Sequence, residues 1–308
     1  MKRRRTITVA IAVALLLLVA GASTQLSKAG AGGLLHPFRR AVTAPVPPGC
    51  EVVTLRGAGV TLHGWRCRAS APRRGTLIYL HGVADNRGSA SGVIARFTQR
   101  GFDVVAYDSR AHGESEGDAC TYGFYEKEDL RCVIDSVDTG PVVLLGTSLG
   151  AAVALQHAGR DARVAAVVAA ETFSDLRTIA TERAPFFFTS ALIAKSFALA
   201  EEQGHFRVDA VTPVAAAATI TAPVLLIHGA LDVDTPPAHA RRVFAALTGP
   251  KRLILVPGAR HNESLRGDIW NEIDQWLDSV LPPRVAGKVS GAPWHPVSPP
   301  RIELGSGV

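Results

Sequence analysis

One serine is a candidate nucleophile because of the residues on either side of it. Ser148 is the centre of the pentapeptide Gly-Thr-Ser-Leu-Gly at 146–150, between an apolar run that ends at Leu145 and a helical pattern that begins at Leu149. A sharp turn from a strand into a helix needs small residues beside its central side chain, and the two glycines supply them. The Leu149 N–H would lie at the helix N-terminus, where it can bind a developing oxyanion. We therefore predict a nucleophilic Ser148 rather than a helix cap.

A serine hydroxyl is a weak nucleophile unless a base removes its proton, and a carboxylate usually orients that base. Two residues further along the chain fit these roles, because each follows an apolar run and is expected at the end of a strand. They are Asp232, the orienting acid, and His261, the general base. The order serine, acid, histidine is the one found when the serine lies on this kind of turn. We predict a triad of Ser148, Asp232 and His261.

Other acids and histidines have positions that favour structural roles. Asp234 is the competing acid, but the sequence Asp-Thr-Pro-Pro at 234–237 is more typical of a cap on the following helix. His228 ends an apolar run before a glycine, and His112 lies in a predicted turn. The remaining histidines apart from His81 are interpreted as surface or structural residues: His36, His63, His157, His205, His239 and His295.

A second oxyanion donor is expected in the loop after the apolar run at 75–80. That loop begins His81-Gly82-Val83, and we predict the Val83 N–H as the donor that acts together with Leu149. Gly82 would let the backbone come close to a substrate. His81 is expected to hold the loop through hydrogen bonds rather than to act as an acid or base.

The elements that must position these residues follow a regular alternation. Short β-branched runs alternate with helical patterns, which predicts an α/β fold with a mostly parallel sheet and helices on both faces. A hairpin at 51–55 and 60–65 would add antiparallel edge strands. The predicted strands are 75–80, 103–107, 141–145, 165–169, 223–227 and 251–256, and the predicted helices are 92–100, 126–137, 149–158, 238–247 and 268–280.

One interval interrupts the alternation. Residues 177–220 are rich in helical patterns and contain three consecutive phenylalanines at 186–188 and an apolar stretch at 191–199. We predict a small helical lid; the alternative is one crossover helix with a long loop. Its apolar side chains would favour an acyl substrate over a charged peptide.

The N-terminus resembles a targeting segment. A basic cluster at 1–5 precedes an uncharged run at 6–22 that ends in small residues, which is typical of a signal peptide and slightly short for a bilayer-spanning helix. We therefore expect export, with the protein secreted or held at the membrane by this segment. The predicted organisation is a signal peptide or membrane anchor at 1–22, a flexible spacer at 23–48, the folded domain at 49–281 and a disordered tail at 282–308.

Four cysteines in an exported chain predict disulfides. Cys50 and Cys67 bracket the hairpin and would face each other across its open end, which leaves Cys120 to pair with Cys132. The alternative is that the thiols are buried as small hydrophobic groups. Their spacings match no zinc pattern, so no metal is expected.

The charge of the chain argues against a nucleic-acid partner. The formal net charge is +6, but four positive charges belong to residues 2–5, which leaves +2 for the rest. No basic stripe with interleaved aromatic residues is present. We expect a small-molecule substrate instead.

Five motifs in this order resemble the α/β-hydrolase superfamily, and they span about 50–281. The similarity is to the broad group of serine aminopeptidases and dienelactone-hydrolase-like enzymes, which has membrane-attached acyl hydrolases among its relatives. The resemblance implies that Asp108, Arg110 and His112 form a supporting turn rather than a catalytic group. Arg260 is a departure, since many relatives have glycine before the catalytic histidine, and it would change access to the base. The motifs are HG at 81–82, DSRAHGES at 108–115, GTSLG at 146–150, HGALD at 228–232 with Pro236, and RHN at 260–262.

These features predict a serine hydrolase that cleaves a carboxylic ester or thioester through an acyl-enzyme and needs no cofactor. A serine peptidase of the aminopeptidase type is the first alternative, and it would need Glu171, Asp175 or Glu182 to pair with a substrate amine. An acyltransferase would use the same acyl-enzyme with another acceptor. An exported binding protein that keeps the fold without the chemistry is the remaining alternative.

Overall fold

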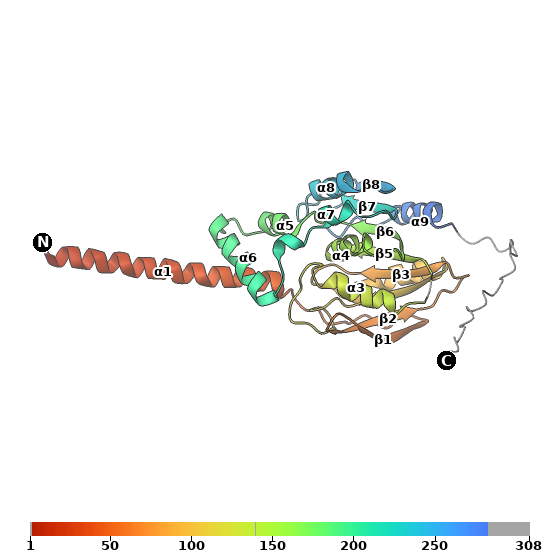
Figure 1. Ribbon diagram of the computed structural model, residues 1–308, viewed down its shortest axis with the longest axis horizontal. Helices are drawn as coiled ribbons and strands as arrows, with labels where there is room; N and C mark the ends of the chain where they lie inside the picture. The colour runs from red at the N-terminus through yellow and green to blue at the C-terminus, as the bar shows by residue number, and fades with distance from the viewer. Residues whose placement is uncertain (1, 139, 283–308) are drawn as a thin grey trace, which may run out of the picture.

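The computed structural model describes residues 2–138 and 140–282, with the side chains of 2–14 and 19 left out. Apart from residue 282, the predicted tail lies outside the described residues. The folded domain is built around one sheet with helices on both faces, and α1 (Lys2–Leu35) extends away from it towards the N-terminus (Figure 1).

The sheet has eight strands in the order β1-β2-β4-β3-β5-β6-β7-β8. β2 pairs antiparallel with β1 and with β4, and all the other neighbours pair in parallel. This confirms the predicted mostly parallel sheet with an antiparallel N-terminal edge hairpin. The strands are β1 (Cys50–Arg56), β2 (Thr61–Cys67), β3 (Gly75–Leu80), β4 (Phe102–Tyr107), β5 (Val142–Thr147), β6 (Val164–Ala170), β7 (Val224–Gly229) and β8 (Lys251–Val256).

Both faces of the sheet are covered, so the central strands β3, β4 and β7 are buried at every residue. Side chains alternate between two cores. Ile78 and Leu80 pack with α3, α4 and α8, while Leu77 and Tyr79 pack with α2 and α9. These helices are α2 (Ser91–Thr98), α3 (Glu126–Asp135), α4 (Leu149–Ala158), α8 (Ala238–Ala246) and α9 (Ile269–Val280).

The interval between β6 and β7 is helical, in the region where the sequence predicts a lid. It contains α5 (Leu176–Glu182), α6 (Ser190–Gly204), a 3₁₀ turn η2 (Val208–Ala210) and α7 (Pro213–Ala217). A polar side chain caps the N-terminus of each of these α-helices by accepting a hydrogen bond from a backbone N–H of the first turn. The caps are Asp175 for α5, Thr189 for α6 and Thr212 for α7. α6 lies beside α1 at one end of the domain (Figure 1).

The expectation of a flexible spacer from residue 23 is wrong for its first part, because α1 continues without a break to Leu35. This part of α1 packs on α6, and a Cβ added at Gly30 would lie 2.5 Å from the Ser196 hydroxyl. Gly30, one of the glycines that suggested a linker, thus permits close contact between two helices. Among the described residues, no helix combines the length and apolar character needed to cross a bilayer.

One of the two predicted disulfides forms. Cys50 and Cys67 are register partners at the open end of the β1–β2 hairpin and are joined by a disulfide, which confirms the prediction. The predicted Cys120–Cys132 bond is wrong, since both cysteines are free. Cys120 is fully buried in a core, whereas Cys132 lies outside the buried stripe of α3 and is partly exposed. The alternative reading of a buried thiol therefore holds for Cys120.

Candidate active site

Ser148 occupies a strained turn between β5 and α4. Its φ of 50° and ψ of −110° are rare for a residue with a side chain, and the surrounding packing must hold them in place. A Cβ on Gly146 would overlap the Gly150 backbone, and a Cβ on Gly150 would overlap the Leu80 carbonyl oxygen. Both glycines are therefore required for the turn, as the sequence motif predicts.

This packing gives a stability prediction for Gly150→Ala. The new methyl group meets backbone rather than a mobile side chain, so we expect a loss of about 1–3 kcal/mol in the free energy of unfolding. Gly92→Ala in α2 is the matched control, because a Cβ there meets no atom within 4 Å. The control should be neutral or slightly stabilising. Urea unfolding followed by circular dichroism measures the free energy of unfolding of both variants. Equal stability of the two variants would contradict the requirement for glycine at position 150.

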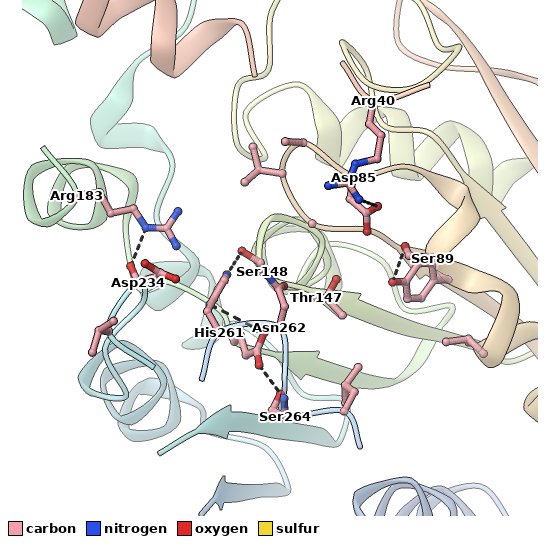
Figure 2. A pocket seen from close by; sticks show the side chains of 18 of the residues that line it. Arg40, Asp85, Ser89, Thr147, Ser148, Arg183, Asp234, His261, Asn262 and Ser264 are labelled. Carbon is pink, nitrogen blue, oxygen red and sulfur yellow. Dashed lines mark hydrogen bonds and ion pairs between the residues drawn. The ribbon is translucent and has the colours of Figure 1, made fainter. Parts of the chain in front are cut away.

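The structure brings the three predicted triad residues together at the carboxyl edge of the sheet. Ser148 follows β5, Asp232 follows β7 and His261 follows β8. His261 Nε2 lies 3.1 Å from the Ser148 hydroxyl oxygen, and His261 Nδ1 lies 2.7 Å from a carboxylate oxygen of Asp232. Figure 2 shows the imidazole of His261 directed at Ser148. The distances are those of a nucleophile, a base and an orienting acid, and their catalytic roles remain predictions.

The surroundings of Asp232 keep it ionised. Burial raises the pKa of this carboxyl, but hydrogen bonds from His228, His261 and the Thr235 N–H outweigh burial and bring the pKa below its ordinary value. A carboxylate can only accept, so His261 Nδ1 carries the proton in this pair. Nε2 of the neutral imidazole is then free to accept the Ser148 proton.

The competing acid does not reach the imidazole. The backbone carbonyl of Asp234 accepts a hydrogen bond from Arg183, at 2.7 Å, and its side chain lines a cavity beside the site. The predicted capping role of Asp234 is wrong, because α8 begins after Pro237 and has no side-chain cap. The turn at Pro236 and Pro237 already places the chain at the start of the helix.

Glu171 holds the loop that carries His261. It directly follows β6, and its carboxylate accepts the backbone N–H groups of Asn262, at 2.6 Å, and Ser264, at 3.0 Å. Asn262 has a φ of 64°, a conformation that asparagine adopts more readily than most residues. This role of Glu171 was not predicted from the sequence. An acidic residue immediately after a strand, at the same sheet edge as the triad, was the available signal.

The loop after β3 is fixed by His81. Its Nδ1 donates to the Gly82 carbonyl, at 2.7 Å, and its Nε2 accepts the Ser109 N–H, at 2.9 Å. Burial lowers the pKa of His81, so it is held neutral in this structural role. Gly82 lies against Ser148, since a Cβ added at Gly82 would be 3.6 Å from the Ser148 Cβ. The loop therefore lies beside the Ser148 side chain.

The two N–H groups predicted as oxyanion donors have no acceptor in the part of the chain that the structure describes. Val83 makes no backbone hydrogen bond there, and Leu149 is the first residue of α4, whose N–H has no partner within the helix. Both residues line a cavity that includes Ser148. Their oxyanion role remains a prediction that this placement supports.

The turn at 108–115 is held by hydrogen bonds within it and by an ion pair to α3. Asp108 accepts the Glu114 N–H at 2.9 Å, His112 Nδ1 donates to the Arg110 carbonyl at 2.8 Å, and Arg110 forms a two-point ion pair with Asp129. Asp108, Arg110 and His112 do not line the two cavities that reach Ser148. This arrangement matches the supporting role that the resemblance implies. Within the described residues, no group of three or more potential ligands could hold a metal ion.

The sequence is similar to a protein family and to two bacterial proteins. Residues 71–198 match the family model described as "Serine aminopeptidase, S33". The chain is 30% identical over 256 residues to the uncharacterized protein YfhR of Escherichia coli, covering 78% of this chain and 84% of that protein. It is 31% identical over 218 residues to the uncharacterized protein YqkD of Bacillus subtilis, and this match covers 67% of this chain and 72% of YqkD.

Solved structures with the same fold include two archaeal enzymes. The Pyrococcus furiosus esterase Pf2001 has a TM-score of 0.63 and 20% identity, and the match covers 80% of this chain and 98% of the esterase. The Pyrococcus horikoshii acylaminoacyl peptidase has a TM-score of 0.61 and 14% identity, and the match covers 78% of this chain and 43% of the peptidase. The protein belongs to the α/β-hydrolase superfamily. Within it, the sequence match is to the S33 serine aminopeptidase family.

Proposed function

We propose that this protein is a serine hydrolase that cleaves a carboxylic ester or thioester through an acyl-enzyme. The observation that carries the proposal is the position of His261, whose two ring nitrogens contact Ser148 and Asp232 at 3.1 and 2.7 Å. An imidazole that is oriented by a carboxylate and contacts a serine hydroxyl can remove the hydroxyl proton, which makes the serine reactive at neutral pH.

The proposed reaction has two steps. His261 Nε2 takes the Ser148 proton as the serine oxygen attacks the carbonyl carbon, and the N–H groups of Val83 and Leu149 stabilise the oxyanion. His261 then gives that proton to the leaving oxygen or sulfur, which leaves the acyl group on Ser148. In the second step, His261 takes a proton from a water molecule as the water oxygen attacks the acyl carbon. His261 then gives that proton to the Ser148 oxygen as the bond between this oxygen and the acyl carbon breaks, which releases the carboxylic acid and restores the serine hydroxyl.

The carboxylates near the site favour an ester over a peptide with a free amine. Glu171 accepts two backbone N–H groups, Asp175 caps α5, and Glu182 contacts His239 Nε2 at 2.8 Å. Each of these three acids therefore has a partner within the protein, and a substrate ammonium would have to compete with that partner. An apolar cavity at Ser148 gives further support to an acyl group as the bound part of the substrate.

We further propose that the protein acts outside the cytoplasm. The basic cluster followed by an apolar run at the N-terminus is typical of exported chains. The Cys50–Cys67 disulfide agrees with an oxidising compartment.

Two measurements on the purified protein test the proposed activity. A fluorophosphonate probe should label Ser148, because only an activated serine reacts with it. p-Nitrophenyl esters should be cleaved with a kcat/KM about tenfold or more above that for amino-acid p-nitroanilides. Preference for the anilides would instead indicate an aminopeptidase, transfer to an added alcohol would indicate an acyltransferase, and absence of labelling would indicate a binding protein.

A further inference from the structure

Two cavities of different character meet at Ser148. The larger, of about 850 Å³, has charged side chains in its wall, including Arg40, Asp85 and Asp234 (Figure 2). The smaller, of about 620 Å³, is lined mainly by apolar residues. Ser148 lines both, so a substrate bound at the serine can extend into each of them.

The position of His261 decides which part of a substrate enters which cavity. His261 lines only the larger cavity. Of the two predicted oxyanion donors, Leu149 lines only the smaller cavity and Val83 lines both. The general base must protonate the leaving group, so the leaving group lies on the side of the imidazole. The acyl chain then extends into the smaller, apolar cavity.

The N-terminal helix forms one wall of this acyl cavity. Leu26, Ala29, Gly30, Gly33 and Leu34 of α1 line it, so a segment that the sequence places beside an export signal is part of the binding site. The cavity is also lined by lid residues, including Ile179 of α5, Phe187 and Phe188 of the following loop, and Ile193 and Phe197 of α6.

The last turns of α1 are attached firmly to the domain. Leu35 is fully buried in a third core together with Leu176 and Phe197. The Tyr122 hydroxyl donates to the Leu34 carbonyl at 3.1 Å, and the Cys120 N–H donates to the Leu35 carbonyl at 2.8 Å. The helix wall therefore has a fixed position relative to Ser148.

We propose that the α1 residues that line the acyl cavity (Leu26, Ala29, Gly30, Gly33 and Leu34) determine acyl-chain specificity, and that the substrates are esters or thioesters with a long apolar acyl chain and a polar leaving group. This inference rests on the proposed function. The volume of the apolar cavity lies within the range of pockets that enclose a ligand of drug size, which is more than a short acyl group fills. The charged wall of the larger cavity suits a polar alcohol or thiol.

Two neighbouring glycines in α1 allow a matched test. Gly33 lines the acyl cavity, and a Cβ added there meets no atom within 4 Å, so a larger side chain can occupy the cavity without a clash at its base. Gly32 also has open space around an added Cβ but does not line the cavity. Both are helical, so leucine at either position improves helix propensity to a similar extent.

The experiment compares the full chain with its Gly33→Leu and Gly32→Leu variants on p-nitrophenyl acetate, butyrate, octanoate, laurate and palmitate. The wild-type protein should prefer the long chains. Gly33→Leu should lower kcat/KM for laurate and palmitate about tenfold or more while acetate stays within about twofold, since only a long chain reaches the filled region. Gly32→Leu should reproduce the wild-type profile.

The outcomes separate this inference from the proposed function. If the wild-type chain hydrolyses p-nitrophenyl acetate and the two variants have the same chain-length profile, the role of α1 in specificity is overturned. The proposed serine hydrolase activity would then still stand. An equal loss on every ester, with an unchanged unfolding temperature, would also overturn it, because it would show a general effect on the site. No hydrolysis of any ester by the wild-type chain would overturn the proposed function itself.

Discussion

Ser148→Ala should abolish ester hydrolysis, with kcat for p-nitrophenyl acetate falling by about 10⁶-fold or to the limit of detection. The hydroxyl lies 3.1 Å from His261 Nε2, and alanine leaves no atom that could attack the carbonyl carbon. The buried methyl group should cost little stability, since the other contacts of the turn are unchanged. Steady-state kinetics on protein purified in parallel with the wild type gives the measurement.

A second serine of the same cavity serves as the control for this variant. Ser89 also lines the larger cavity, but its hydroxyl donates to the Asn86 carbonyl at 3.0 Å and contacts the Tyr79 hydroxyl rather than a histidine (Figure 2). Ser89→Ala should retain activity within a few-fold and should still react with a fluorophosphonate probe. Full activity of Ser148→Ala would show that the nucleophile lies elsewhere.

The sheet could be predicted from the sequence because each strand is a short apolar run with clear boundaries. The predicted run at 75–80 is β3, the run at 251–256 is β8, and the predicted helix at 149–158 is α4, with identical bounds. Parallel strands with both faces covered need continuous apolar residues. Turn-forming or charged residues mark the two ends of each such run. The candidate triad could be located for the same reason, since each member lies within five residues after such a run.

Contacts between distant segments could not be predicted in this way. The support that Glu171 gives to the His261 loop joins residues 91 and 93 positions apart, and no local pattern reports such a pairing. Gly30 in α1 could belong to a linker or to a helix contact, and only the position of Ser196 on α6 decides between them. The Cys120–Cys132 bond was predicted wrongly for the same reason. It was inferred only because these two cysteines remained after Cys50 had been paired with Cys67, and no local pattern placed them together.

Asp232→Asn should lower kcat by about 10⁴-fold with little change in the fold. The Thr235 N–H donates to one carboxylate oxygen of Asp232 at 2.7 Å, so the amide of the variant must keep its carbonyl oxygen on that side. Its NH₂ group then faces His261 Nδ1 and requires that nitrogen to accept. The imidazole proton moves to Nε2, the atom that must receive the Ser148 proton, so the base is held in the wrong tautomer. Steady-state kinetics on p-nitrophenyl acetate gives the loss in kcat.

Asp234→Asn provides the matched control two residues away. The contact of Asp234 with Arg183 is made by its backbone carbonyl, which the substitution leaves in place, so kcat should stay within a few-fold of the wild type. Both variants remove one negative charge from the same loop, and a general electrostatic effect would therefore lower both rates alike. Because Asp232 contacts the imidazole and Asp234 does not, a large difference between the two variants would identify Asp232 as the orienting acid. The reverse order, with Asp234→Asn the more damaged, would transfer that role to Asp234 and require the loop to rearrange when substrate binds.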